Sequence, residues 1–134
     1  MIALNKTDEA IKMLTPLQRQ SPNNEVLTLN LVVSLQTAKQ YQQAEKILAL
    51  FIRTHPEHVL AHLIAIDLYK QTKNKAKEHA HRAQLLSLKG LFRKASQEMG
   101  TALIYAQSSL DQARYSASID LYKKQDIRLS ALQK

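Results

Sequence analysis

The chain has 134 residues, a net charge of +8, and a composition that is 45% apolar with 2 Gly, 3 Pro and no Cys. This length is sufficient for one domain with a hydrophobic core, and the scarcity of Gly and Pro favours a mostly helical fold. The absence of Cys excludes disulfides, thiolate nucleophiles and most structural zinc sites. The charge is uneven, with 6 basic and 5 acidic residues in 1–58 but 13 and 6 in 59–134.

Apolar residues recur three and four positions apart along most of the chain, which is typical of helices that bury one face. The pattern predicts seven helices, at 8–20, 25–38, 41–54, 58–71, 75–89, 92–106 and 110–132. The second is apolar nearly all round, so we expect it to be buried on more than one side. We interpret the N-terminus, MIALNKTDEA, as the tail of one helix that runs into the turn before the next. On this interpretation the chain is cut from a longer protein.

Two positions near the C-terminus carry specific expectations. Gly100 lies inside a predicted helix and is taken to mark a close contact between helices. Ser109 and Gln112 form a capping box for the last helix. The apolar residues of that helix, among them Ala113 and Leu121, are sparse. We therefore expect a terminal lid with one face in water.

The chain repeats itself at a spacing of 34 residues. The repeated residues are Ala10, Lys12, Leu14, Arg19 and Pro22, which recur as Ala44, Lys46, Leu48, Arg53 and Pro56. The next equivalent of Ala44 is Ala95, and the distance of 51 residues is one repeat plus half a repeat. The helix predicted at 75–89 is therefore an inserted helix, which serves as the second helix of one unit and the first helix of the next. Units of this length must stack on copies of themselves to bury their apolar faces.

These units resemble tetratricopeptide repeats. The residues at that family's packing positions are Leu31, Leu35, Tyr41, Ala44, Leu48, Phe51 and Pro56 in 25–58, and Ala83, Leu86, Gly90, Phe92, Ala95, Met99 and Ala102 in 76–109. The sequence departs from the family pattern at Val32, where a small residue is usual, at Glu78, where Ala is expected, and at Lys39 and Lys73, which replace the turn glycine.

The resemblance implies an all-α, tetratricopeptide-like α-solenoid of about seven antiparallel helices with a C-terminal capping helix. It implies one repeat domain over 1–134, made of a partial unit at 1–24, a full unit at 25–58, a half unit at 59–75, a unit at 76–109 and the capping helix at 110–132. It also implies a non-catalytic module for protein–protein interaction.

A narrower resemblance lies in the second half of the chain. The half-unit shift, His79, Arg82-Ala83 and the Gly90 turn occur together, as in the C-terminal repeats of bacterial periplasmic zinc metalloproteases of the beta-barrel-assembly-enhancing type. In that family a protease domain precedes the repeats, and the repeats contact outer-membrane assembly proteins. The resemblance thus implies a periplasmic location, an upstream protease domain, and docking on assembly partners or substrate. The alternative is a free-standing or self-associating scaffold, which could be homo-oligomeric and cytoplasmic.

In tetratricopeptide repeats the first helix of each unit faces a concave groove that holds a protein or peptide partner. The positions expected to face it are Val26, Leu29, Asn30, Val33, Gln36, Leu60, Leu63, Asp67 and Lys70. Only Asn30 resembles the Lys/Asn/Arg clamp by which chaperone-binding relatives hold a peptide carboxylate, so we do not expect that ligand class. A mostly aliphatic groove favours an apolar partner segment, although a neighbouring domain, the last helix or a second copy could equally cover it.

A second candidate surface is basic. Its residues are Lys75, Lys77, Arg82, Lys89, Arg93 and Lys94. They could attract an anionic partner, but they are scattered and few aromatic residues accompany them, so nucleic acid is not expected and a solvated face is the simpler interpretation.

The sequence offers no chemistry of its own. The HExxH zinc motif is absent, and no Gly-rich phosphate loop or nucleophile with a base is present. His55, His58 and His62 have a spacing that could approach a metal, but Pro56 interrupts the helix between them. We therefore expect no enzyme activity, no cofactor and no metal site in this chain, and no run of about 20 apolar residues indicates membrane insertion.

Overall fold

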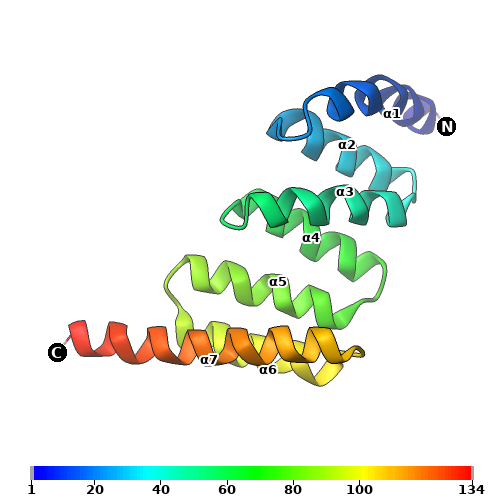
Figure 1. Cartoon of the computed structure of the whole chain (residues 1–134). Helices are drawn as coiled ribbons and strands as arrows, with labels where there is room; N and C mark the ends of the chain where they lie inside the picture. The colour runs from blue at the N-terminus through cyan, green and yellow to red at the C-terminus, as the bar shows by residue number, and fades with distance from the viewer. Residues whose placement is uncertain (1, 134) are drawn as a thin grey trace. The chain divides into compact units, whose positions relative to one another are not determined.

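The computed structural model describes the backbone of residues 2–133 and the side chains of residues 6–133. These residues form seven α-helices and no strand (Figure 1). The helices are α1 (Ile2–Gln20), α2 (Glu25–Thr37), α3 (Tyr41–Thr54), α4 (Val59–Gln71), α5 (Lys75–Leu88), α6 (Phe92–Tyr105) and α7 (Ser109–Leu132). The predicted all-α fold is confirmed, and six of the predicted helices agree with these bounds to within one residue.

The first helix was predicted wrongly at its start. It runs without a turn from Ile2 to Gln20, whereas a turn was expected before residue 8. Asn5, Thr7 and Asp8 each disfavour a helix interior by at most ~0.7 kcal/mol, which neighbouring residues can offset. Pro16 does lie inside the helix, where the hydroxyl of Thr15 donates to the carbonyl of Ile11 (2.6 Å).

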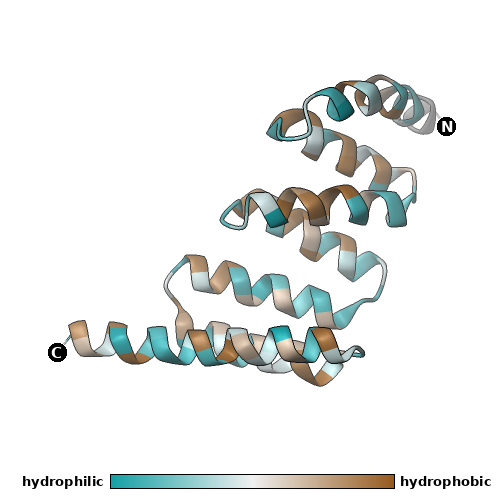
Figure 2. Cartoon of the chain, in the orientation of Figure 1, coloured by the Kyte–Doolittle hydropathy of each residue, from teal (hydrophilic) through white to brown (hydrophobic). Residues whose placement is uncertain are grey.

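The chain divides into two compact units, residues 1–68 and 69–134, and each is described by itself. The division falls within α4 and inside the predicted half unit at 59–75, while the predicted repeat boundaries stay predictions. Figure 2 shows apolar residues concentrated along α2, α3 and α4, and polar residues along α5.

In unit 1 the core lies where α2 meets α1 and α3. Leu31, Val32, Leu35 and Leu48 are at most 1% exposed. Phe51 of α3 is 3% exposed, whereas Leu17, the residue 34 positions before it in α1, is 43% exposed. The equivalent apolar positions of the repeat are therefore buried in α3 and only partly buried in α1.

In unit 2 the core is formed by small residues of α5, by α6 and by two tyrosines of α7. Its buried members are Ala76, Ala80, Ala83, Ala95, Met99, Ala102, Tyr115 and Tyr122. His79 of α5 forms an ion pair with Glu98 of α6, and Arg82 pairs with Glu78 one turn earlier in α5 (2.6 Å). The alanines of α5 allow α6 to pack closely, and Ala95, Met99 and Ala102, which stand at packing positions of the repeat family, are buried.

As expected for a terminal helix with one face in water, α7 leaves Ala113 and Leu121 exposed and packs through Tyr115, Ile119 and Tyr122, which lie four and three residues apart on one helix face. The expectation about Gly100 was wrong. Gly100 marks no close contact, because a Cβ atom placed there would have no heavy atom within 4 Å.

Three turns in the chain share one geometry. The turns after α2, α4 and α5 each place one residue in the left-handed region, namely Lys39 (φ 62°), Lys73 (φ 61°) and Gly90 (φ 77°). The next amide in each turn donates to a carbonyl five residues back, as from Gln40 to Leu35 (2.8 Å). This is the Schellman motif, which satisfies the last carbonyls of a helix. The three left-handed residues are therefore spaced 34 and then 17 positions apart.

A second repeated feature links the start of a helix to the turn before it. Thr28 and His62 lie 34 residues apart, and both side chains are fully buried. The hydroxyl of Thr28 donates to the carbonyl of Pro22 (3.3 Å), and Nε2 of His62 donates to the carbonyl of Pro56 (2.7 Å). Each bond braces the first turns of a helix against the preceding proline turn.

The cap of α7 lies one residue before its predicted position. Ser108, not Ser109, is the N-cap, and its hydroxyl accepts from the amide of Asp111 (3.1 Å). Ser108 has the extended backbone that an N-cap requires (φ −109°, ψ 148°), while Ser109 is already helical.

Candidate functional site

The first turns of α2 and α4 lie next to each other in unit 1. Nε2 of His58, just before α4, contacts the carboxylate of Glu25 at the start of α2 (2.7 Å). The other ring nitrogen of His58, Nδ1, accepts from the amide of Ala61 and caps α4 (3.1 Å). This pair joins the beginnings of the two helices that were predicted to line the groove, and Figure 1 shows them running in the same general direction.

Four aliphatic side chains on these helices are open to solvent. Their exposed fractions are 67% for Val26, 45% for Val33, 52% for Leu60 and 50% for Leu63. We call these four residues the aliphatic face. Asn30 and Asp67, which were predicted to lie on the same side, are exposed as well.

Three predicted groove residues are not part of this face. Leu29 and Gln36 are buried, with 5% and 8% of their surface exposed. At about 100° per residue they are rotated by roughly 60–80° from Val26 on the helix, which turns them toward the core. Lys70 is exposed but belongs to unit 2.

The three histidines of the proline turn have structural partners. His62 is fully buried against the Pro56 carbonyl, and its pKa is lowered mainly by burial and slightly by nearby His58, against the opposing effect of that hydrogen bond. His55 stacks on Phe51 with ring centroids 4.3 Å apart, and His58 meets the same ring edge-on. Within the described residues no group of three His, Asp or Glu side chains could hold a metal ion.

The predicted basic residues fall into separate groups. Lys75 and Lys77 begin α5, whereas Lys89, Arg93 and Lys94 follow its other end, about 21 Å away for 14 residues. Arg82 lies between these groups and is paired with Glu78, and Arg93 contacts Asp126 of α7 (3.4 Å).

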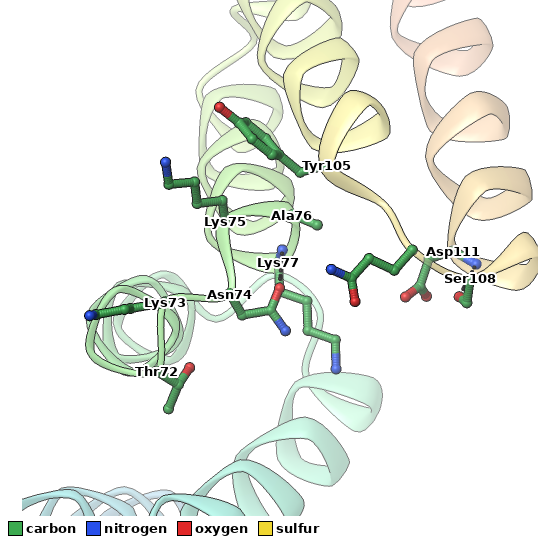
Figure 3. Close-up of a pocket in the computed structure, with 10 residues that line it drawn as sticks. Thr72, Lys73, Asn74, Lys75, Ala76, Lys77, Tyr105, Ser108 and Asp111 are labelled. Carbon is green, nitrogen blue, oxygen red and sulfur yellow. Dashed lines mark hydrogen bonds between the residues drawn. The ribbon is translucent and has the colours of Figure 1, made fainter.

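The lysines at the start of α5 adjoin a surface pocket of about 590 Å³. One side is formed by the α4–α5 turn and the first turn of α5, and the other by the end of α6 and the start of α7 (Figure 3). Its lining residues are Thr72, Lys73, Asn74, Lys75, Ala76, Lys77, Tyr105, Gln107, Ser108 and Asp111. The ammonium groups of Lys75 and Lys77 lie 5.4 Å from the ring centres of Tyr105 and Tyr69 respectively.

Sequence reasoning missed Lys73 and Asn74 as members of this site. Asn74 is the N-cap of α5, where its side chain accepts from the amide of Lys77 (3.2 Å). The signal was available, because Asn before a helix that begins with alternating lysines predicts a cap surrounded by positive charge.

A comparison with known protein families gives a match in the first half of the chain. Residues 1–65 match the family model described as tetratricopeptide repeat. The match covers α1 to α3 and the first half of α4, and it supports a tetratricopeptide repeat domain over most of unit 1. Repeats of this kind are typically non-catalytic and bind proteins. No curated protein is similar enough to the chain to count as a match. No helix within residues 2–133 is both long and apolar enough to cross a bilayer.

Proposed function

We propose that the aliphatic face of unit 1 binds an apolar segment of a partner protein. The observation that carries this proposal is the exposure of Val26, Val33, Leu60 and Leu63 on two helices whose first turns are joined by Glu25 and His58. Exposed aliphatic side chains that gather into a patch typically mark a protein contact. An amphipathic helix or an extended apolar strand could supply the complementary surface.

Binding measurements with matched variants test this role. Leu60→Glu and Leu63→Glu place a charge on the aliphatic face, and Leu50→Glu, at a leucine of α3 with 57% exposure, is the control. We expect a pull-down quantified by mass spectrometry to lose the same proteins with either face variant and to retain them with the control. Equal recovery with all three, in variants that keep their helical circular dichroism, would refute the proposal.

We further propose that the chain is the C-terminal repeat region of a periplasmic zinc metalloprotease, which it docks on outer-membrane assembly partners or on substrate. The support is the half-unit step marked by the turns at Lys39, Lys73 and Gly90, together with the sequence around His79 and Arg82. Reading the gene upstream of Met1 tests this. A coding region without a secretion signal and without HExxH would rule the protease context out.

The alternative proposal is a free-standing, cytoplasmic adaptor that associates with itself. It is favoured by α1, where Met13 is 66% and Leu17 is 43% exposed although the equivalent Phe51 is buried. Sedimentation at several concentrations distinguishes the two proposals, because an adaptor of this kind should form dimers that Leu17→Glu abolishes.

A further inference from the structure

All of the formal net charge of +8 belongs to one of the two units. Unit 1 holds 6 basic and 6 acidic residues, whereas unit 2 holds 13 basic and 5 acidic residues. The unit with the aliphatic face is therefore close to neutral, and unit 2 carries a field that attracts anions.

Within unit 2 the carboxylates are not spread evenly. Glu78 pairs with Arg82 and Asp126 with Arg93, so two of the predicted basic residues already have acidic partners. Three lysines stand together at the start of α5, at positions 73, 75 and 77, and Lys73 and Lys75 are exposed. Only one carboxylate, that of Asp111, lines the same pocket, so its lining has a surplus of positive charge.

The pocket also offers neutral groups that can hydrogen-bond to an anion. Thr72, Gln107 and Ser108 contribute hydroxyl and amide groups to its walls. Its volume of about 590 Å³ lies within the ~300–1,000 Å³ of typical ligand sites. We call Lys73, Lys75 and Lys77 with this cavity the lysine pocket.

We propose that the lysine pocket binds an acidic segment of a partner protein, through two or more neighbouring Asp or Glu carboxylates. A nucleic acid fits less well. The ring of Tyr105 already faces the ammonium of Lys75, which leaves no free aromatic platform for a base. Of the other predicted basic residues, Arg82 is paired with Glu78, and Lys89, Arg93 and Lys94 follow the far end of α5, about 21 Å away, so this set forms no continuous basic track for a phosphate backbone.

This inference goes beyond the proposed function, because it concerns a different unit and a different chemistry. Together the two proposals describe a partner that offers an apolar segment to unit 1 and an acidic segment to unit 2. Each can fail without the other, since Leu63→Glu alters the aliphatic face and leaves the lysine pocket intact.

Titration of the whole chain with fluorescein-labelled hexaglutamate tests the lysine pocket. The test variant carries Lys73→Gln, Lys75→Gln and Lys77→Gln. The matched control carries Lys89→Gln, Lys123→Gln and Lys124→Gln, which removes the same charge from exposed positions of unit 2 outside the pocket. Loss of positive charge at the start of α5 does not weaken that helix, because cations are unfavourable near a helix N-terminus.

We expect affinity measured by anisotropy at 50 mM NaCl to fall about ten-fold in the pocket variant and at most about three-fold in the control. Leu63→Glu should leave hexaglutamate binding unchanged. Three results would overturn the proposal: equal losses in both triple variants, no salt-sensitive binding of hexaglutamate, or tighter binding of a labelled 20-nucleotide oligo(dT) that the pocket variant abolishes.

Discussion

Lys39 occupies a backbone conformation that suits glycine, and replacing it should stabilise the protein. Its φ of 62° lies in the left-handed region, where a Cβ atom crowds the following carbonyl at a cost of about 1–2 kcal/mol. Lys39→Gly removes that cost. Glycine also makes the unfolded chain more flexible, which offsets about 0.4–1 kcal/mol of the gain. The expected net increase in the free energy of unfolding is therefore about 0.5–1 kcal/mol.

The turn itself should survive the substitution. Its hydrogen bonds run between backbone atoms, from Lys39 to Gln36 (2.9 Å) and from Gln40 to Leu35 (2.8 Å), and Gly90 makes the same motif after α5. Urea unfolding followed by circular dichroism measures the effect, with an unchanged slope and a higher midpoint expected.

Lys39→Ala is the matched control, because it removes the lysine side chain but keeps the Cβ atom. We expect it to change the free energy of unfolding by no more than about 0.5 kcal/mol. If Lys39→Gly is no more stable than Lys39→Ala, the hypothesis that the left-handed backbone at this position destabilises the protein is refuted.

Three further predictions follow from single positions. Gly90→Ala should destabilise the protein by about 1–2 kcal/mol because Gly90 has a positive φ. Gly100→Ala should stabilise the protein by about 0.5–1 kcal/mol because Gly100 lies in a helix with open space around it. Thermal unfolding of the two variants checks that the effects have opposite signs. Ser108→Ala should lower the free energy of unfolding in urea by about 1 kcal/mol through loss of the α7 cap, while a similar loss in Ser109→Ala would contradict the assigned cap. Burial lowers the pKa of His62, so as the pH falls the imidazole takes up a proton in the unfolded chain before it does so in the folded one. The contribution of His62 to the free energy of unfolding should therefore be complete above about pH 6.5 and should fall below it by up to ~1.4 kcal/mol per pH unit. His62→Thr should reduce that slope in urea titrations from about pH 7 to 5, and an unchanged slope would refute the assignment.

Helix positions were predictable from sequence because most boundaries carry local signals. Asn24, Pro56 and Asn74 mark starts, and Gly90 marks an end, so periodicity and punctuation agree there. The start of α1 was missed because it has no such signal. The apolar residues of α7 are too sparse to define its packing face by periodicity, and the large tyrosines Tyr115 and Tyr122 determine which side packs because they bury the most apolar surface.

The candidate site was less predictable than the fold. The family pattern suggested Val26, Val33, Leu60 and Leu63 for the groove, and all four are exposed, but that pattern could not distinguish Leu29 from them, since burial depends on which neighbours are present. The lysine pocket joins residues from the α4–α5 turn with Ser108 and Asp111, more than 30 positions away in sequence. Such a juxtaposition follows from how α5, α6 and α7 pack, which no local signal encodes.

The equivalent hydrogen bonds of Thr28 and His62 show which chemical property this position of the repeat requires. A hydroxyl and an imidazole differ in size, acidity and polarity, yet both donate to the carbonyl of the equivalent proline. The repeat therefore preserves a donor of suitable reach and not a particular amino acid. Comparisons that score residue identity see no likeness between threonine and histidine here. Repeats that have diverged in this way can be matched by the hydrogen bond each position makes, and designers can exchange the two side chains to decide whether a given repeat responds to acid.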